Sequence, residues 1–187
     1  MAAIQSWIGH HRMMPQYQLP LVVVNLTIPV TMVVNRSAAP GPVVPVLVYA
    51  DVGKAIDWLC ETFGFAERFR YGPEGNPAGA QLSVGKGSVF LTSPRVGQSP
   101  KWADRAEFRP PRPDEVSHSV AVHVEDVDRH YEHAKQCGAR ILGAPETHPF
   151  GERQYTVEDL GGHRWTFTQS VADVSPEEWG GTQPTRL

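Results

Sequence analysis

The sequence predicts an α+β fold in which one β-α-β-β-β unit occurs twice along the chain. Three observations carry this prediction. The same order of five elements appears in residues 43–93 and again in residues 118–170. An aspartate opens the helix of each half, and these two residues, Asp51 and Asp126, lie 75 positions apart. A glycine follows each helix. Self-similarity of this kind indicates an internal duplication.

The first unit begins with an apolar, β-branched strand over 43–51, which follows a cluster of proline and glycine. Apolar side chains at helical spacing then predict a helix over 52–63, and Gly64 is a typical residue to end it. Two of the later strands flank the turn Gly85-Lys86-Gly87, which is typical of a hairpin. The three strands that complete the unit are expected at residues 66–71, 80–84 and 88–92.

The second unit repeats this order. Val120, Val122 and Val124 alternate with other residues, which predicts a strand over 118–126 with one apolar face. A helix over 127–137 follows, and a glycine again ends it. The remaining strands are expected at residues 140–142, 153–158 and 164–168, the last two joined by a hairpin.

The composition is that of an ordinary soluble globular domain. The 187 residues include 41% hydrophobic and 20% charged residues, and the formal net charge is −3. No basic block stands out, so nucleic acid is not an expected partner. Cys60 and Cys137 are too few for a disulfide framework, which favours a reducing compartment, the cytoplasm. Asn25 and Pro29 interrupt the apolar stretch 19–34, so no membrane span is expected.

The domain organisation follows from the duplication. We interpret residues 43–170 as one domain, whose two units are joined by a proline-rich, charged linker. The segment before it is expected to be disordered, or to precede the true start of the protein at Met32. A secretory signal is disfavoured there because the apolar region is interrupted. The boundaries are 1–42 for the N-terminal extension, 43–93 for unit one, 94–117 for the linker, 118–170 for unit two and 171–187 for the C-terminal tail.

Three segments resemble one protein family. They are VYADVGKAIDWLCETFGF in the first unit, VAVHVEDVDRHYEHAKQCGARI in the second, and GERQYTVEDLGGHRWTF near the end of the domain. Together they are similar to the glyoxalase/bleomycin resistance protein/extradiol dioxygenase superfamily, also called vicinal oxygen chelate or VOC, in its glyoxalase-like subgroup. The resemblance implies that the two units form a cupped mixed β-sheet with the helices outside and the ligand on the concave side. The family includes enzymes of several kinds and binding proteins without catalysis, so the fold does not select a reaction.

The resemblance also implies where a metal would bind. Catalytic members hold a divalent metal through His, Gln or Glu side chains on the first and last strands of each unit. The matching positions are Val44, Phe90, Ser119 and Thr166. Valine and phenylalanine do not coordinate metals, and hydroxyls are poor ligands without carboxylates. We therefore expect no metal and no other cofactor. A one-residue slip would direct His118 into the cup, but a single imidazole makes no metal site.

Period-2 alternation selects the side chains that face the cup. Most are small or apolar, which suits a partly apolar ligand. Trp102, in the linker, either closes over this ligand or pins the linker to the domain. Arg153 either binds an anionic group or pairs with Glu152 or Asp159, and we favour the structural role. The candidate ligand-binding residues are Val46, Val48, Phe90, Trp102, His118, Ser119, Ala121, His123, Arg153 and Thr166.

Other chemically capable residues are expected to be structural. His130 and His133 belong to a solvated helix face rather than to a metal site. Asp159 accepts backbone N–H bonds within its turn. Trp179 anchors a helical turn that opens at Ser175.

Two functions remain open. The first is a small-molecule-binding protein, for an antibiotic-like compound or a metabolite. The second is an enzyme, a lyase, isomerase or related VOC-type catalyst, that uses His118, His123 or Arg153 in the same cup; no catalytic residue is assigned. A protein-interaction domain is less favoured because the fold supplies a concave pocket. Apolar residues of the extension and linker, such as Trp102 and Phe108, favour a homodimer.

Overall fold

The computed structural model describes residues 35–39, 41–94, 109–112 and 115–182. Residues 37–187 form one compact unit, which holds every helix and strand described below. Trp102, Phe108 and nearly all of the predicted N-terminal extension lie outside the described residues.

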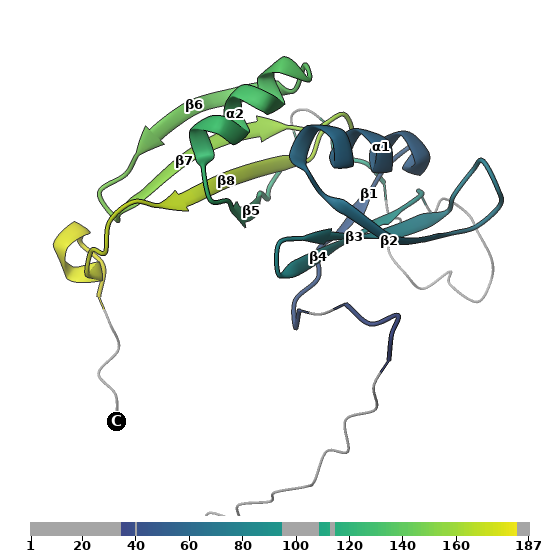
Figure 1. Cartoon of the computed structure of the whole chain (residues 1–187), viewed down its shortest axis with the longest axis horizontal. Helices are drawn as coiled ribbons and strands as arrows, with labels where there is room; N and C mark the ends of the chain where they lie inside the picture. Colours follow the sequence, from purple (N-terminus) through teal and green to yellow (C-terminus); the bar gives the residue numbers. More distant parts are fainter. Residues whose placement is uncertain (1–34, 40, 95–108, 113–114, 183–187) are drawn as a thin grey trace, which may run out of the picture. The chain divides into compact units, whose positions relative to one another are not determined.

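The first unit forms a four-stranded sheet in the strand order β1-β4-β3-β2, with β1 and β4 parallel and the other pairs antiparallel. Helix α1 lies over one face of this sheet (Figure 1). The side chain of Asp51 accepts a hydrogen bond from the Lys54 amide at 3.0 Å, and Gly64 ends the helix with φ 68°. The elements are β1 (Val46–Val48), α1 (Val52–Phe63), β2 (Ala66–Tyr71), β3 (Gly79–Val84) and β4 (Gly87–Thr92).

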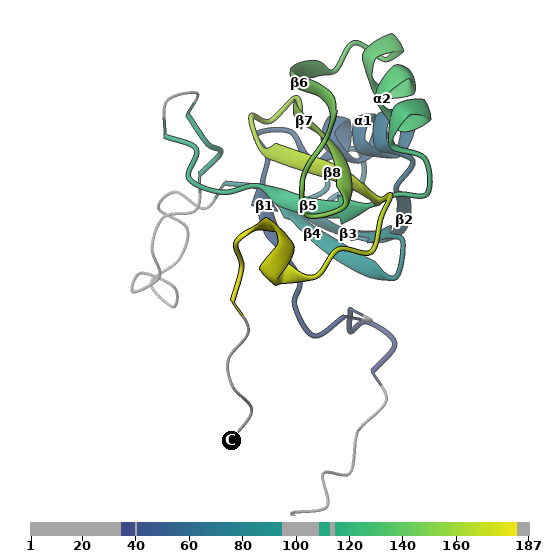
Figure 2. The ribbon, with the colours of Figure 1, turned by 90° about the vertical axis from the view of Figure 1, so that its left-hand side faces the viewer.

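The second unit repeats this architecture with the strand order β5-β8-β7-β6. Its first strand again pairs in parallel with its last, so the predicted α+β fold of two βαβββ units is confirmed. Figure 2 shows α1 and α2 on the same side of the two sheets. The elements are β5 (Val120–His123), α2 (Val127–Gln136), β6 (Arg140–Thr147), β7 (Glu152–Glu158) and β8 (Arg164–Ser170).

Strand β6 is much longer than the predicted 140–142. Its pairing with β7 continues to Thr147, opposite Arg153, and the register shifts on either side of Gly143. Each shift breaks the period-2 pattern that sequence reasoning depends on. Strand β5 is shorter than the predicted 118–126 because it pairs with β8 only over Val120–His123.

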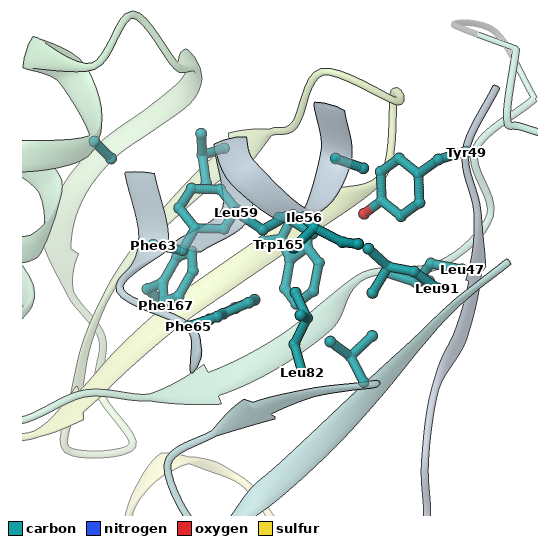
Figure 3. Close-up of a cluster of buried hydrophobic side chains, with 14 of the residues drawn as sticks. Leu47, Tyr49, Ile56, Leu59, Phe63, Phe65, Leu82, Leu91, Trp165 and Phe167 are labelled. Carbon is teal, nitrogen blue, oxygen red and sulfur yellow. The ribbon is translucent and has the colours of Figure 1, made fainter. Parts of the chain in front are cut away.

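One hydrophobic core serves both units. Phe63, at the end of α1, lies with its ring centroid 4.8 Å from that of Phe167 and 5.7 Å from that of Trp165, and both partners belong to β8. Figure 3 shows these rings beside Leu82 from the first sheet. Trp165 and Phe167 are fully buried, as the alternation along β8 predicts. Because α1 contributes to the packing of both sheets, neither unit buries its apolar face alone.

The carboxylate of Asp159 joins the two units by hydrogen bonds. Its Oδ1 accepts from the amides of Gly161 at 2.8 Å and His163 at 2.9 Å, which confirms the predicted turn role. Its Oδ2 accepts from the Tyr49 hydroxyl at 2.6 Å and from the Trp165 indole at 2.9 Å. Gly161 allows this approach, since a Cβ there would lie 2.5 Å from the Tyr49 ring. Burial and the negative charge of Asp159 raise the pKa of Tyr49 well above its usual value.

Two histidines of α2 form a second connection. His130 Nε2 lies 3.3 Å from the Phe63 carbonyl, and His130 Nδ1 lies 2.6 Å from the Tyr155 hydroxyl. His133 Nε2 lies 2.8 Å from the Glu61 carbonyl. These side chains satisfy carbonyls at the end of α1 that have no partner within the helix. The predicted solvated face is wrong for His130, which is partly buried against a helix of the other unit; His133 reaches the same helix but is exposed, as predicted.

The C-terminal tail contains a short 3₁₀ helix, Pro176–Trp179, where a helical turn was predicted. The Ser175 hydroxyl donates to the Glu178 carboxylate at 2.9 Å, which fixes its first turn. The ring of Trp179 packs edge-on against Phe150, with 5.9 Å between centroids. This contact anchors the start of the tail to the second unit.

Tyr49→Phe should destabilise the protein by about 1–3 kcal/mol, because it removes a buried hydrogen bond to a carboxylate. Urea unfolding followed by tryptophan fluorescence measures the loss. Tyr131→Phe is the matched control, since its hydroxyl has no hydrogen bond within the described part of the chain. Equal unfolding midpoints for the two variants would contradict the role of Asp159.

Stability should fall as the pH falls below about 6.5, the usual histidine pKa in an unfolded chain. Burial lowers the pKa of both His130 and His163 in the folded protein. Protons therefore bind the unfolded state more readily, and the stabilisation present above this pH is lost below it. Urea midpoints at pH 7.5 and 5.5 test the prediction. His130→Gln should reduce the difference and His123→Gln, at an exposed position, should not; the same difference in both variants would contradict it.

Candidate functional site

Two hollows flank the edge strands β1 and β5. Within the described residues these two strands share no ladder, because β1 pairs only with β4 and β5 only with β8. The smaller hollow, the edge depression, has a volume of about 490 Å³; the larger, the inter-sheet cavity, has about 1170 Å³. Both are lined by Pro45, Val120 and Ala121. The open edges of the two sheets thus create space where the units meet.

The edge depression gathers four of the ten predicted ligand-binding residues. Val46, which is 51% exposed, contributes an apolar side chain from β1. His118, Ser119 and Ala121 contribute from the start of β5 and the segment before it. Ala121 and His123 also line the inter-sheet cavity. The structure therefore brings predicted residues from both units together at this edge.

The facing of these side chains follows the predicted alternation. Leu47 and Tyr49 lie in the core, so Val46 and Val48 lie on the opposite face of the first sheet. Val48 is buried on that face. In the second sheet the fully buried Trp165 belongs to the core side, and Thr166 lies on the other face.

The four positions that match the family's metal ligands offer a weak donor set. Ser119 Oγ and Thr166 Oγ1 lie 2.9 Å apart and hydrogen-bond to each other. Phe90 stands opposite Val46 in the β1–β4 ladder. Among the described residues, no group of three or more His, Cys, Asp or Glu side chains is placed to hold a metal ion. The donors present, two hydroxyls bonded to each other, do not fit a divalent ion.

The inter-sheet cavity combines apolar side chains with a few polar groups. Val43, Ala121 and Val122 are exposed or partly exposed on its lining, while Phe63, Trp165 and Phe167 lie behind it and are buried in the core. Ser88 also lines it; its hydroxyl is buried and has no hydrogen-bond partner in the part of the chain described. Lys86 adds a cationic side chain. This lining suits an apolar molecule that carries a polar group.

His163 is a buried residue near the edge depression that sequence reasoning treated only as part of a turn. Its Nε2 lies 2.9 Å from the Val48 carbonyl and donates to it, which leaves Nδ1 as an acceptor. Nδ1 is buried without a partner among the described residues, and the ring lies 6.0 Å from that of His118. Burial lowers the pKa of His163 despite the attraction of Asp159, so the ring is neutral at pH 7. The one sequence feature that marks His163 is its position directly after Gly161 and Gly162.

A polar cluster on the second sheet was also missed. Glu152 accepts hydrogen bonds from the Thr168 hydroxyl at 2.6 Å and from the Gln154 amide at 2.8 Å. The Thr168 bond is the main reason that the pKa of Glu152 lies below its usual value, and the nearby charges of His123 and His148 act in the same direction. Tyr155 lies in the core, so alternation along β7 places Glu152 and Gln154 together on the opposite face. This placement could have been predicted from the sequence.

Arg153 lies away from both hollows. Its guanidinium forms a two-pronged pair with Asp128 of α2, with Nε–Oδ2 and Nη2–Oδ1 distances of 2.9 and 2.8 Å. The predicted structural role is supported, but the expected partners, Glu152 and Asp159, are wrong. Arg153 shares the helix-side face of β7 with Tyr155, so a residue of α2, and not one of the adjoining turns, lies within its reach.

The geometry agrees with comparisons to known proteins. The solved structure of TioX from Micromonospora sp. ML1 is 34% identical with a TM-score of 0.56, and the match covers 68% of this chain and 96% of that chain. The uncharacterized protein Rv0887c of Mycobacterium tuberculosis is 29% identical over 149 residues, or 79% of this chain and 84% of that protein. A glyoxalase-related enzyme from Fulvimarina pelagi, 22% identical with a TM-score of 0.52, covers 69% of this chain and 87% of its own, and shares the fold.

The family profile described as Glyoxalase/Bleomycin resistance protein/Dioxygenase superfamily matches residues 41–167. This range begins before β1 and ends within β8, so it includes nearly all of both βαβββ units and both edge strands that border the two hollows. The chain therefore belongs to the glyoxalase/bleomycin resistance protein/dioxygenase superfamily.

Proposed function

We propose that the protein binds a small, partly apolar molecule between its two sheets, an antibiotic-like compound or a metabolite. The observation that carries the proposal is the inter-sheet cavity of about 1170 Å³, whose lining includes the exposed or partly exposed apolar residues Val43, Ala121 and Val122. Ligand sites in proteins typically occupy roughly 300–1,000 Å³ and are mostly apolar with few polar groups. The cavity is large enough for such a ligand, and the exposed Lys86 on its lining offers a polar contact.

Binding without a divalent metal is part of the proposal. It is supported by the side chains at the four family positions, where Val44 and Phe90 have no donor atom and Ser119 and Thr166 bond to each other. The ligand would then be held by apolar contact and hydrogen bonds rather than through a shared metal ion.

A catalytic function is the second candidate, favoured by one observation. His123 is exposed on the lining of the inter-sheet cavity and lies close enough to Glu152 to influence its pKa. A histidine near a carboxylate is a common acid–base arrangement. Substituting His118, His123 and Arg153 separates the functions: turnover lost with binding retained favours the enzyme.

We also propose that two copies of the chain pair, in the cytoplasm. Val46, at the start of the edge strand β1, is 51% exposed, and Val43, three positions before it, is 79% exposed. Apolar surface of this kind usually belongs to an interface. In the part of the chain described, no helix is long and apolar enough to cross a membrane.

Ala121→Phe should weaken ligand binding, because Ala121 is exposed and lines both hollows. With 2-naphthalenemethanol as a neutral aromatic probe, calorimetric titration should give an affinity roughly fivefold lower than that of the wild type. Ala144→Phe, at an exposed position on β6 that lines neither hollow, is the matched control. Failure of the wild type to bind the probe at millimolar concentration, or equal losses in both variants, would contradict the proposal.

Protein purified without chelator should contain well under one equivalent of divalent metal per chain, because the matched positions lack nitrogen and carboxylate ligands. Elemental analysis by mass spectrometry makes the measurement. A stoichiometric ion that Thr166→Ala removes would contradict metal-free binding.

Light scattering at micromolar concentration should give a mass near twice the 20.7 kDa of the chain, because the exposed edge valines favour pairing. Val43→Asp should shift the mass toward that of the monomer, while Val171→Asp, in the tail, should not. A wild-type mass of one chain would contradict the proposed dimer.

A further inference from the structure

The inter-sheet cavity runs along the free edge of β5. Every residue of 120–126 lines this cavity, although successive side chains of a strand lie on opposite faces of the sheet. A cavity that touches both faces of one strand lies along the edge of that strand. β5 pairs only with β8 among the described strands, and it forms one edge of the second sheet (Figure 1). The main chain of β5 is therefore part of the cavity lining.

Two residues of β5 direct their main-chain groups to this edge. In a parallel pair, alternate residues of a strand bond to the neighbouring strand, and the residues between them are directed away from it. The Val124 amide donates to the Thr168 carbonyl at 2.9 Å, and Val122, two positions earlier, is oriented in the same way. The N–H and C=O groups of Ala121 and His123 therefore face the cavity. Neither residue's main chain has a hydrogen-bond partner in the part of the chain that the structure describes.

The edge of β5 lacks the features that protect the outer edges of both sheets. On β6 these features are Pro145 and two shifts of register. On β2 they are charged side chains and one shift between Glu67 and Phe69, which makes Arg68 the extra residue. Proline, bulges and charges prevent an edge from pairing with another chain. β5, with the sequence VAVH, has no proline, no shift of register and no Asp, Glu, Lys or Arg, so its free edge is able to pair with an added strand.

The cavity has room for an extended molecule beside this edge. Its volume is about 1170 Å³. From the first unit it is lined by the β3–β4 turn, where Gly85 and Gly87 carry no side chain, and a Cβ at Gly85 would have no neighbour within 4 Å. From the second unit, Val120 and Val122 are partly exposed beside the free main-chain groups. The lining thus combines hydrogen-bonding main chain with apolar side chains.

We propose that the ligand of the inter-sheet cavity is an extended, peptide-like molecule whose amide groups pair with the main chain of β5 at Ala121 and His123. This inference rests on the proposed function and specifies its ligand class. Ala121 and His123 are roughly 6.7 Å apart along the strand, which is the repeat of two residues in an extended peptide. Such a ligand adds a strand to the second sheet: main-chain hydrogen bonds give affinity, and contact with Val120 and Val122 selects apolar side chains.

Two matched ligands and two proline variants of the full-length protein test this pairing. The peptide probe is N-acetyl-L-valyl-L-phenylalanine methylamide, and its counterpart, the diester, has ester oxygens in place of the N–H groups of both residues. The diester is the more apolar compound, so a cavity that recognised only apolar surface would prefer it. Ala121→Pro removes the N–H that faces the cavity and leaves the β8 ladder intact, since proline is tolerated on a free edge. Ala144→Pro is the matched control, at an exposed position of the outer edge strand β6 that lines neither hollow.

Calorimetric titration should show that the wild type prefers the peptide over the diester by roughly fivefold, as expected for the loss of one hydrogen bond. Ala121→Pro should lose most of this preference, and Ala144→Pro should retain it. Thermal unfolding confirms that both variants are folded. Equal affinity of the wild type for the two ligands, or a preference for the diester, would overturn the inference, and so would an unchanged preference in Ala121→Pro.

The wild-type comparison is sufficient even if Ala121→Pro does not fold, because it needs no substitution. 2-Naphthalenemethanol separates this inference from the proposed function. If the wild type binds this alcohol but not the peptide, the binding function stands and the peptide-like ligand class is wrong. If neither compound binds, the proposed binding function itself fails.

Discussion

The buried carboxylate of Asp159 is the interaction on which the arrangement of the two units depends. It accepts four hydrogen bonds, two from its own turn, one from Trp165 and one from Tyr49 of the other unit. Asp159 is 5% exposed, and a buried carboxylate is tolerated only when its oxygens are satisfied. The Tyr49 hydroxyl is therefore held at one place, and with it the end of the first strand.

This constraint explains why there is space between the sheets. Asp159 accepts a hydrogen bond from Tyr49, directly after β1, and His163 of the same turn donates to the Val48 carbonyl. At the opposite end of the interface, His130 holds the end of α1 through the Phe63 carbonyl. Both connections join the units without a ladder between β1 and β5 in the described structure. The edges of the two sheets consequently remain open, and the hollows lie between them.

The two sheets present different kinds of side chain on their non-core faces. The first sheet presents Phe90, Tyr71 and the bulged Arg68 on its non-core face. The second presents hydroxyls and a carboxylate, with Ser119 bonded to Thr166 and Thr168 bonded to Glu152. The non-core faces of the two duplicated sheets therefore differ in chemistry, aromatic and cationic on the first and polar on the second.

Local patterns predict much of this structure. The bounds of α1, the core side of Trp165 and the turn role of Asp159 follow from helical spacing, alternation and turn chemistry. Contacts between distant residues do not follow from such patterns: the Tyr49–Asp159 bond spans 110 positions, and Arg153 pairs with Asp128 of a helix.

β-Bulges are a second reason why sequence patterns do not predict which face a side chain lies on. Arg68 appears on the non-core face only because the register shifts at that point, and alternation alone does not reveal the shift. The length of β6 was missed for the same reason. Residues aimed by irregular backbone therefore require the structure.

The central claim is that a ligand binds between the two sheets. Nuclear Overhauser contacts between the ring protons of bound 2-naphthalenemethanol and protein methyl groups test it most directly. The account predicts contacts to the methyl groups of Ala121 and Val122, which line the inter-sheet cavity, and none to Val171, which is exposed and lines neither hollow. Contacts to Val171 without contacts to Ala121 and Val122 would contradict it.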